Sequence, residues 1–79
     1  MDKYHLTAVI WQEGKQYVSK CPELGVASCG RTPERARHAL EEAVSLYLEN
    51  AKQLGIIKDL EPVLSVRTHY TTSIEVTVP

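Results

Sequence analysis

The stretch CPELGVASCGRTPERARHALEEA, residues 21–43, carries the strongest structural signals in this 79-residue chain. A short run of strand-forming residues at 26–29 ends at Gly30, and the pair Thr32-Pro33 follows it. Thr32 is a good N-cap, because its hydroxyl can accept a hydrogen bond from a backbone N–H of the first helical turn. Pro33 suits the first helical position, where its missing N–H is not needed. The stretch therefore predicts a short strand followed directly by a helix.

The predicted helix spans residues 33–54, and Gly55 supplies its stop. Small and apolar residues recur every three or four positions along one face, which is typical of a helix that packs on a sheet. This stripe comprises Ala36, Leu40, Ala43, Tyr47, Ala51 and Leu54, widened by Val44 and Leu48. The basic residues at 31–38 are interrupted by Glu34 and followed by Glu41 and Glu42, which favours a mixed solvated face; a basic edge that docks a partner is the alternative.

Three further strands are expected before and after these elements. Residues 4–11 are rich in strand formers with apolar side chains on both faces, and a polar turn around Gly14 joins them to a second strand at 16–20. Pro22 and Gly25 then separate that strand from the one at 26–29. Residues 73–78 alternate in polarity, so Ile74, Val76 and Val78 are expected to point inward from a last strand.

The element order is β-β-β-α-β, which predicts an α+β fold in a single domain, residues 1–79. A right-handed crossover would place the last strand beside the first, giving a four-stranded mixed sheet of order 3-2-1-4 with the long helix on one face. Residues 56–70 are harder to assign. Pro62 excludes one continuous helix there, and residues 63–66 are a candidate extra strand.

Composition limits the functional classes. The net charge is −1, so the basic stripe of a non-specific nucleic-acid binder is missing. Cys21 and Cys29 are too few for a disulfide framework, and the chain starts without a signal-peptide pattern, so we expect a cytoplasmic protein with reduced thiols. A domain of this size has a thin core, which favours homo-oligomerisation.

Catalytic and metal-binding patterns are also missing. Metal-dependent RNA cleavage needs several converging carboxylates, and residues 4–12 contain none. The two cysteines are eight positions apart without a Cys-x-x-Cys pair, and His5, His38 and His69 are isolated in sequence. We therefore expect no catalytic residues, no cofactor and no metal, and a protein that is not an enzyme.

An ordered set of short motifs resembles the HicB-like antitoxin family. The set consists of Tyr17-Val18, Pro22-Glu23-Leu24, Gly30-Arg31-Thr32, Ala36, Glu42-Ala43 and Tyr47-Leu48-Glu49. The resemblance implies a partial RNase H-like fold and a homo-oligomer that binds a HicA-like toxin, a small RNase that cleaves mRNA. Many family members also carry a C-terminal DNA-binding domain; the chain ends at Pro79, so DNA binding is not expected. The family's usual PELPG turn is one residue shorter here.

The expected function is therefore neutralisation of a HicA-like toxin by covering its RNA-binding surface. The candidate contact residues are Trp11, Tyr17, Glu23 and Tyr70. Trp11 is expected on the sheet face opposite the helix, where an aromatic side chain can anchor an interface or simply pack against residues 56–70. Glu13 and Glu23 could imitate phosphate groups. The alternative function is an orphan homo-oligomeric interaction or small-ligand-binding module without a toxin partner.

Overall fold

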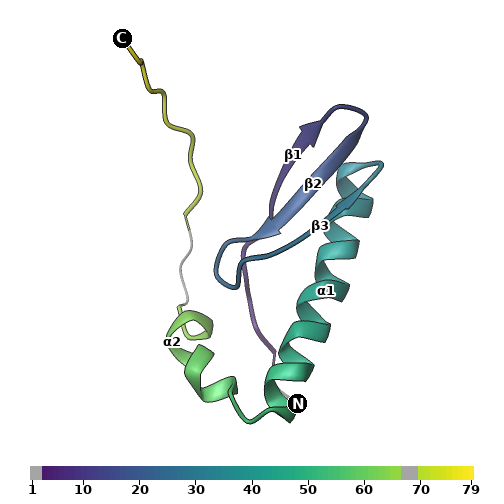
Figure 1. The fold of residues 1–79 in the computed structure, drawn as a ribbon, viewed down its shortest axis with the longest axis vertical. Coiled ribbons are helices and arrows are strands. Elements are labelled where there is room, and N and C mark those ends of the chain that lie inside the picture. The colour runs from purple at the N-terminus through teal and green to yellow at the C-terminus, as the bar shows by residue number, and fades with distance from the viewer. Residues whose placement is uncertain (1–2, 67–69) are drawn as a thin grey trace.

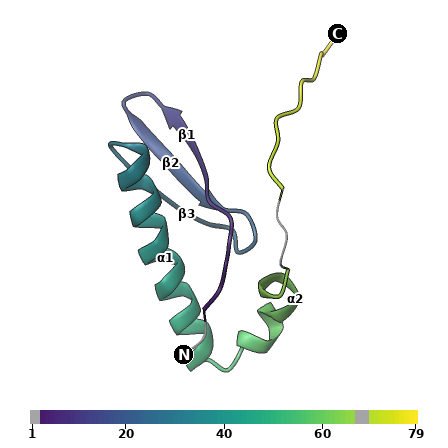
Figure 2. The same cartoon turned by 180° about the vertical axis from the view of Figure 1, so that it is seen from behind.

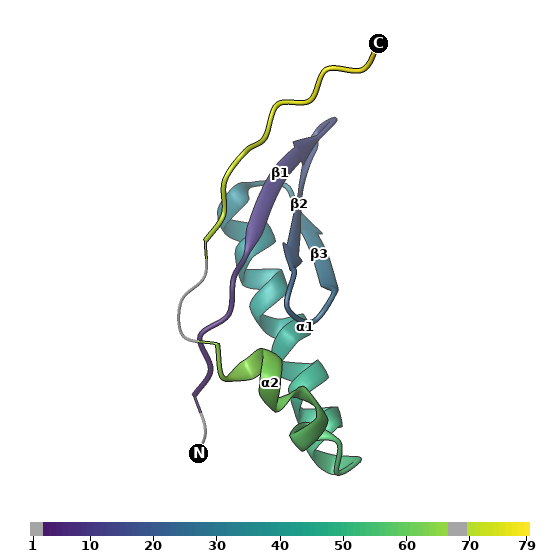
Figure 3. The ribbon, with the colours of Figure 1, turned by 90° about the vertical axis from the view of Figure 1, so that its left-hand side faces the viewer.

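The computed structural model describes residues 3–66 and 70–79 of the chain (Figure 1). Three strands come first: β1 (Val9–Glu13), β2 (Gln16–Cys21) and β3 (Val26–Gly30). The long helix α1 (Pro33–Gln53) follows, and then the short 3₁₀ helix η1 (Ile57–Leu60) and α2 (Glu61–Leu64). The described residues form one antiparallel sheet of order β1-β2-β3, with α1 packed along one of its faces (Figures 1 and 3).

Two glycine turns set the register of the sheet. Gly14 has a φ of 62° in the two-residue turn between β1 and β2, a conformation that glycine adopts without a steric cost. Gly25 has a φ of 72° in the turn before β3, and its N–H donates to the carbonyl of Cys21 at 2.9 Å. The strands predicted at 16–20 and 26–29 are confirmed, each extended by one residue.

The helix predicted at 33–54 is confirmed, ending one residue earlier at Gln53, and its ends have the expected caps. Thr32 Oγ1 accepts a hydrogen bond from the Arg35 N–H at 3.1 Å, with Pro33 in the first turn. At the other end Gly55 has a φ of 73°, and its N–H donates to the Lys52 carbonyl at 3.1 Å. The capping residues therefore end the helix where the sequence pattern places its termini.

Small side chains let α1 approach the sheet closely. Among the residues that the structure describes, the buried ones are Ser19, Cys21, Ala36, Leu40 and Ala51. A Cβ atom added to Gly30 would lie 2.6 Å from the backbone nitrogen of Ala36, so β3 and the first turn of α1 touch through their backbones. The core is thin, as expected for a chain of this length.

The predicted four-stranded sheet of order 3-2-1-4 is wrong. Residues 70–79 form no strand: all ten are exposed, and the segment runs past the β1 side of the sheet without joining it (Figures 1 and 2). The inward orientation expected for Ile74, Val76 and Val78 is wrong as well, because these side chains are 84%, 70% and 82% exposed. Alternating polarity indicates a strand but does not supply the neighbouring edge that it needs.

Two other sequence predictions need correction. The first strand begins at Val9 rather than at residue 4, because the described residues before Val9 pair with no neighbouring strand. The candidate strand at 63–66 is wrong: α2 covers Glu61–Leu64, with Pro62 in its first turn, where a proline is tolerated. No helix in the described part of the chain is long and apolar enough to cross a lipid bilayer.

Candidate protein-binding surface

The sheet has one covered face and one open face. Ser19 in the middle of β2 points toward α1, since its Oγ donates to the Ala36 carbonyl at 2.8 Å. Successive side chains of a strand alternate between faces, so Val18 lies on the side away from α1. The strand register pairs Val18 with Trp11 on β1 and with Cys29 on β3. These three side chains form a row across the face that α1 leaves uncovered.

We call this face, made by three rows of residues, the open face. The rows are Val9–Lys20–Ala27, Trp11–Val18–Cys29 and Glu13–Gln16. Among the described elements, η1 and α2 make no contact with the strands, so neither packs on it. Trp11 is 38% exposed, and its Nε1–H donates to Glu13 Oε1 at 2.9 Å. The open face therefore presents a half-exposed indole whose orientation is held by a neighbouring carboxylate.

Glu23 links the residues before β1 to the turn between β2 and β3 through hydrogen bonds. Its Oε2 accepts hydrogen bonds from the Thr7 N–H at 3.0 Å and the Thr7 hydroxyl at 2.7 Å. Partial burial is the largest single influence and by itself would raise the pKa of this carboxyl. The hydrogen bonds from Thr7, from the backbone of Glu23 and from Cys21 together favour the ionised form more strongly, so the net effect lowers the pKa of Glu23. The carboxylate thus ties the residues before β1 to the β2–β3 turn.

Both cysteines lie in the described part of the chain and are free thiols. Cys21 is buried under α1, and burial raises the pKa of its thiol; the nearby Glu23 carboxylate acts in the same direction. Its Sγ lies 3.5 Å from Glu23 Oε1. Cys29 is exposed on the open face. A buried thiol with a raised pKa is a poor nucleophile, so Cys21 acts as a small core residue.

The structure does not bring the four predicted contact residues together. Trp11 lies on the open face, whereas Tyr17 is half-buried on the side facing α1, two residues before Ser19. Glu23 lies in the β2–β3 turn and is engaged by Thr7. Tyr70 is 89% exposed on the C-terminal segment. Of the four, Trp11 is the one that the fold presents on the open face.

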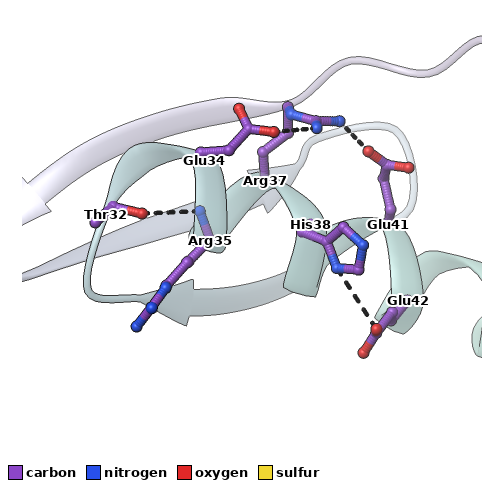
Figure 4. Close-up of polar contacts among 7 residues, drawn as sticks. All are labelled: Thr32, Glu34, Arg35, Arg37, His38, Glu41 and Glu42. Carbon is purple, nitrogen blue, oxygen red and sulfur yellow. Dashed lines mark hydrogen bonds and ion pairs between the residues drawn. The ribbon is translucent and has the colours of Figure 1, made fainter.

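The basic residues at the start of α1 are interleaved with carboxylates (Figure 4). Arg37 forms ion pairs with Glu34 and with Glu41, one turn to each side. The hydrogen bond from Arg37 lowers the pKa of Glu34. His38 Nδ1 lies 3.5 Å from Glu42 Oε1. This arrangement matches a mixed solvated helix face and argues against a continuous basic surface for nucleic acid.

A groove of about 950 Å³ lies between residues 3–8 and one side of α1. Its apolar floor includes Leu40, Val44 and Leu48, and its rim includes Glu41 and Lys52. Sequence analysis missed this groove because it placed residues 4–8 inside the first strand. The sequence does contain one sign of the groove. Val44 and Leu48 make the apolar stripe of the helix wider than a narrow sheet can cover.

Metal ligands do not cluster in the parts of the chain at 3–66 and 70–79: no group of three or more His, Cys, Asp or Glu side chains is placed to hold an ion. No protein family, curated protein or solved structure matched this chain in the comparisons.

Proposed function

We propose that this chain is an antitoxin-like protein that binds a small RNA-cleaving toxin of the HicA type and covers its RNA-binding surface. The observation that carries this proposal is the open face, where Trp11 stands half-exposed in the row with Val18 and Cys29. The ordered HicB-like motifs in residues 17–49 supply the toxin as the partner class.

The open face has the chemistry of a protein interface. A tryptophan that becomes fully buried on binding is among the strongest single contributors to protein–protein affinity. Here the indole is already oriented by its hydrogen bond to Glu13, which reduces the side-chain entropy lost on binding. Three paired strands with α1 behind them form a firm support for that ring. We propose Trp11 as the central anchor.

The negative charge of Glu13 on the open face favours a partner that binds RNA. A protein that binds RNA needs a basic surface to neutralise phosphate groups. Glu13 stands beside Trp11 on the same face and presents a carboxylate to such a surface. Complementary charges speed association and favour the correct partner over others. The antitoxin then acts by occupying the RNA site, with no chemical step of its own, in the cytoplasm where mRNA is found.

The experiment is an RNA-cleavage assay with the small HicA-like RNase that this proposal expects to be encoded beside this chain's gene. We expect the wild-type chain to suppress cleavage at a one-to-one ratio and Trp11→Ala to require at least about tenfold more protein, as for loss of an anchor residue. Tyr47→Ala is the matched control: Tyr47 is 37% exposed, against 38% for Trp11, but lies on α1. The proposal is contradicted if both variants lose the same degree of suppression, or if the wild-type chain leaves RNA cleavage undiminished.

A second candidate function is a homo-oligomeric interaction module that has no toxin partner. The exposed, alternately apolar segment at residues 70–79 favours it. The same assay separates the two functions, since this module would self-associate in solution while leaving RNA cleavage unchanged.

A further inference from the structure

The C-terminal segment has the composition of a strand but lies in solvent. Residues 72–78 read Thr-Ser-Ile-Glu-Val-Thr-Val, so polar residues alternate with β-branched apolar ones from Ser73 onward. In an extended chain, Ile74, Val76 and Val78 share one side. Each of these three side chains is at least 70% exposed. Three neighbouring exposed aliphatic side chains on one side of an extended segment indicate a surface that another chain covers.

The β1 side of the sheet offers the complementary surface. β1 is an outer strand of the sheet, and its outward backbone N–H and C=O groups have no strand partner among the described residues. The groove floored by Leu40, Val44 and Leu48 lies beside the residues that lead into β1. The helix packs mainly on β3 and β2 and least on β1, which is why this part of its apolar stripe stays open.

We propose that the chain forms a strand-exchanged dimer, in which residues 72–78 of one copy add as an edge strand to β1 of a second copy. Ile74, Val76 and Val78 then face the partner's groove, while Ser73, Glu75 and Thr77 face away from it. Each copy has an open edge at β1 beside the groove, and a strand-like segment that pairs with no strand of the described residues, so two copies satisfy both features in a closed, symmetric arrangement. The inference does not depend on the toxin.

A second copy fits the segment better than an unrelated partner does. Addition of an extended peptide to a sheet edge takes its affinity from main-chain hydrogen bonds and its specificity from pockets for alternate side chains. Both requirements are met within one chain: the edge and the groove on one side, the alternating segment on the other. Exchange also enlarges a core that is thin in a single copy.

The first test measures the mass of the full chain in solution by size-exclusion chromatography with light scattering. We expect twice the 8.9 kDa chain mass for the wild type. The double variant Ile74→Asp/Val76→Asp should weaken the dimer by at least about a hundredfold, because it places charges in an apolar groove. Ser73→Asp/Thr77→Asp adds the same charge on the other side and should leave the dimer intact. Three results overturn the proposal: a monomeric wild type, a dimer that Ile74→Asp/Val76→Asp leaves unaffected, or an equal loss of dimer in the two double variants.

The second test decides which copy receives the segment. A photo-cross-linking amino acid replaces Thr77, and equal amounts of ¹⁵N-labelled and unlabelled chain are mixed by unfolding and refolding. Exchange between copies predicts that about half of the cross-linked pairs joining this segment to β1 carry one label of each kind, as random pairing requires. If both members of every cross-linked pair carry the same label, the segment binds its own chain. This result overturns the proposal, whatever masses the aspartate variants show.

Discussion

Ser19 Oγ donates a 2.8 Å hydrogen bond to the carbonyl oxygen of Ala36 and thereby joins the middle of β2 to the first turns of α1. Both residues are fully buried. This contact identifies the side of the sheet that α1 covers, and Trp11 lies on the opposite side.

Ser19→Ala removes the donor of this contact while keeping the small volume of the site. We expect the free energy of unfolding to fall by about 1 kcal/mol, the usual net contribution of such a hydrogen bond. Urea titration followed by circular dichroism measures it. Ser45→Ala is the control, because Ser45 is an exposed serine of α1, and we expect it to change stability by less than half as much. An unchanged value for Ser19→Ala would show that the contact does not hold the two layers together.

Gly30→Ala tests the close approach of β3 and α1. The added Cβ would lie 2.6 Å from the Ala36 nitrogen and 2.8 Å from the Arg35 carbonyl carbon, and backbone atoms cannot turn aside as a side chain can. We expect a loss of about 2–3 kcal/mol in unfolding free energy, typical of overpacking. Gly25→Ala provides the comparison, because it meets nothing within 4 Å and is strained only through its φ of 72°. A smaller loss at Gly30 than at Gly25 would contradict the packing described here.

Glu23 predicts how stability responds to acid. Its pKa is lowered in the folded state from an ordinary value of 4.5, so its contribution is complete above that value and is lost as the pH falls through the folded-state pKa. We expect Glu23→Gln to reduce stability at neutral pH and to flatten the decline below about pH 4.5. Thermal melts from pH 7 to pH 3 give the profile. Glu61→Gln removes an equal charge from α2 and should keep the wild-type profile; an unchanged profile for Glu23→Gln would refute the role of the Thr7 contact.

The two thiols should differ in reactivity. Cys29 is exposed on the open face, whereas Cys21 is buried with a raised pKa. A thiol reagent such as Ellman's reagent should therefore modify about one thiol per chain quickly in the native protein and the other only on unfolding, since the thiolate is the reacting form. Cys29→Ser should abolish the fast phase. A fast phase that persists in this variant would place Cys21 at the surface.

Local sequence signals predicted the local structure of this chain well. The Thr32 cap, Pro33 and Gly55 bound α1 closely, because capping depends on hydrogen bonds within a few residues. Strand pairing was predicted less well. The alternation at Ile74, Val76 and Val78 is real, but a strand also needs an edge, and sequence alone does not show which edge is available to it.

For the candidate site, too, local features were predicted well and contacts between distant residues were not. The two-residue period of the strands was sufficient to place Trp11 opposite the helix face, since the period follows from backbone geometry. It did not show that Glu23 is engaged by Thr7, a residue sixteen positions away in the sequence. The period alone also did not show that Tyr17 and Trp11 lie on opposite faces of the sheet. The strand register shows it, because Trp11 pairs with Val18, the neighbour of Tyr17. Contacts between distant segments account for what sequence analysis missed.

The central claim is that the open face binds the toxin, and the single tryptophan of the chain offers a direct measurement of it. A ¹⁵N-labelled sample gives one indole N–H signal, from Trp11, which can be followed by NMR as unlabelled HicA-like RNase is added. The account predicts that this signal and the backbone amides of Val18 and Cys29 shift together, while the amide of Tyr47 on α1 stays in place. A complex that forms with the Trp11 indole signal unmoved would contradict it.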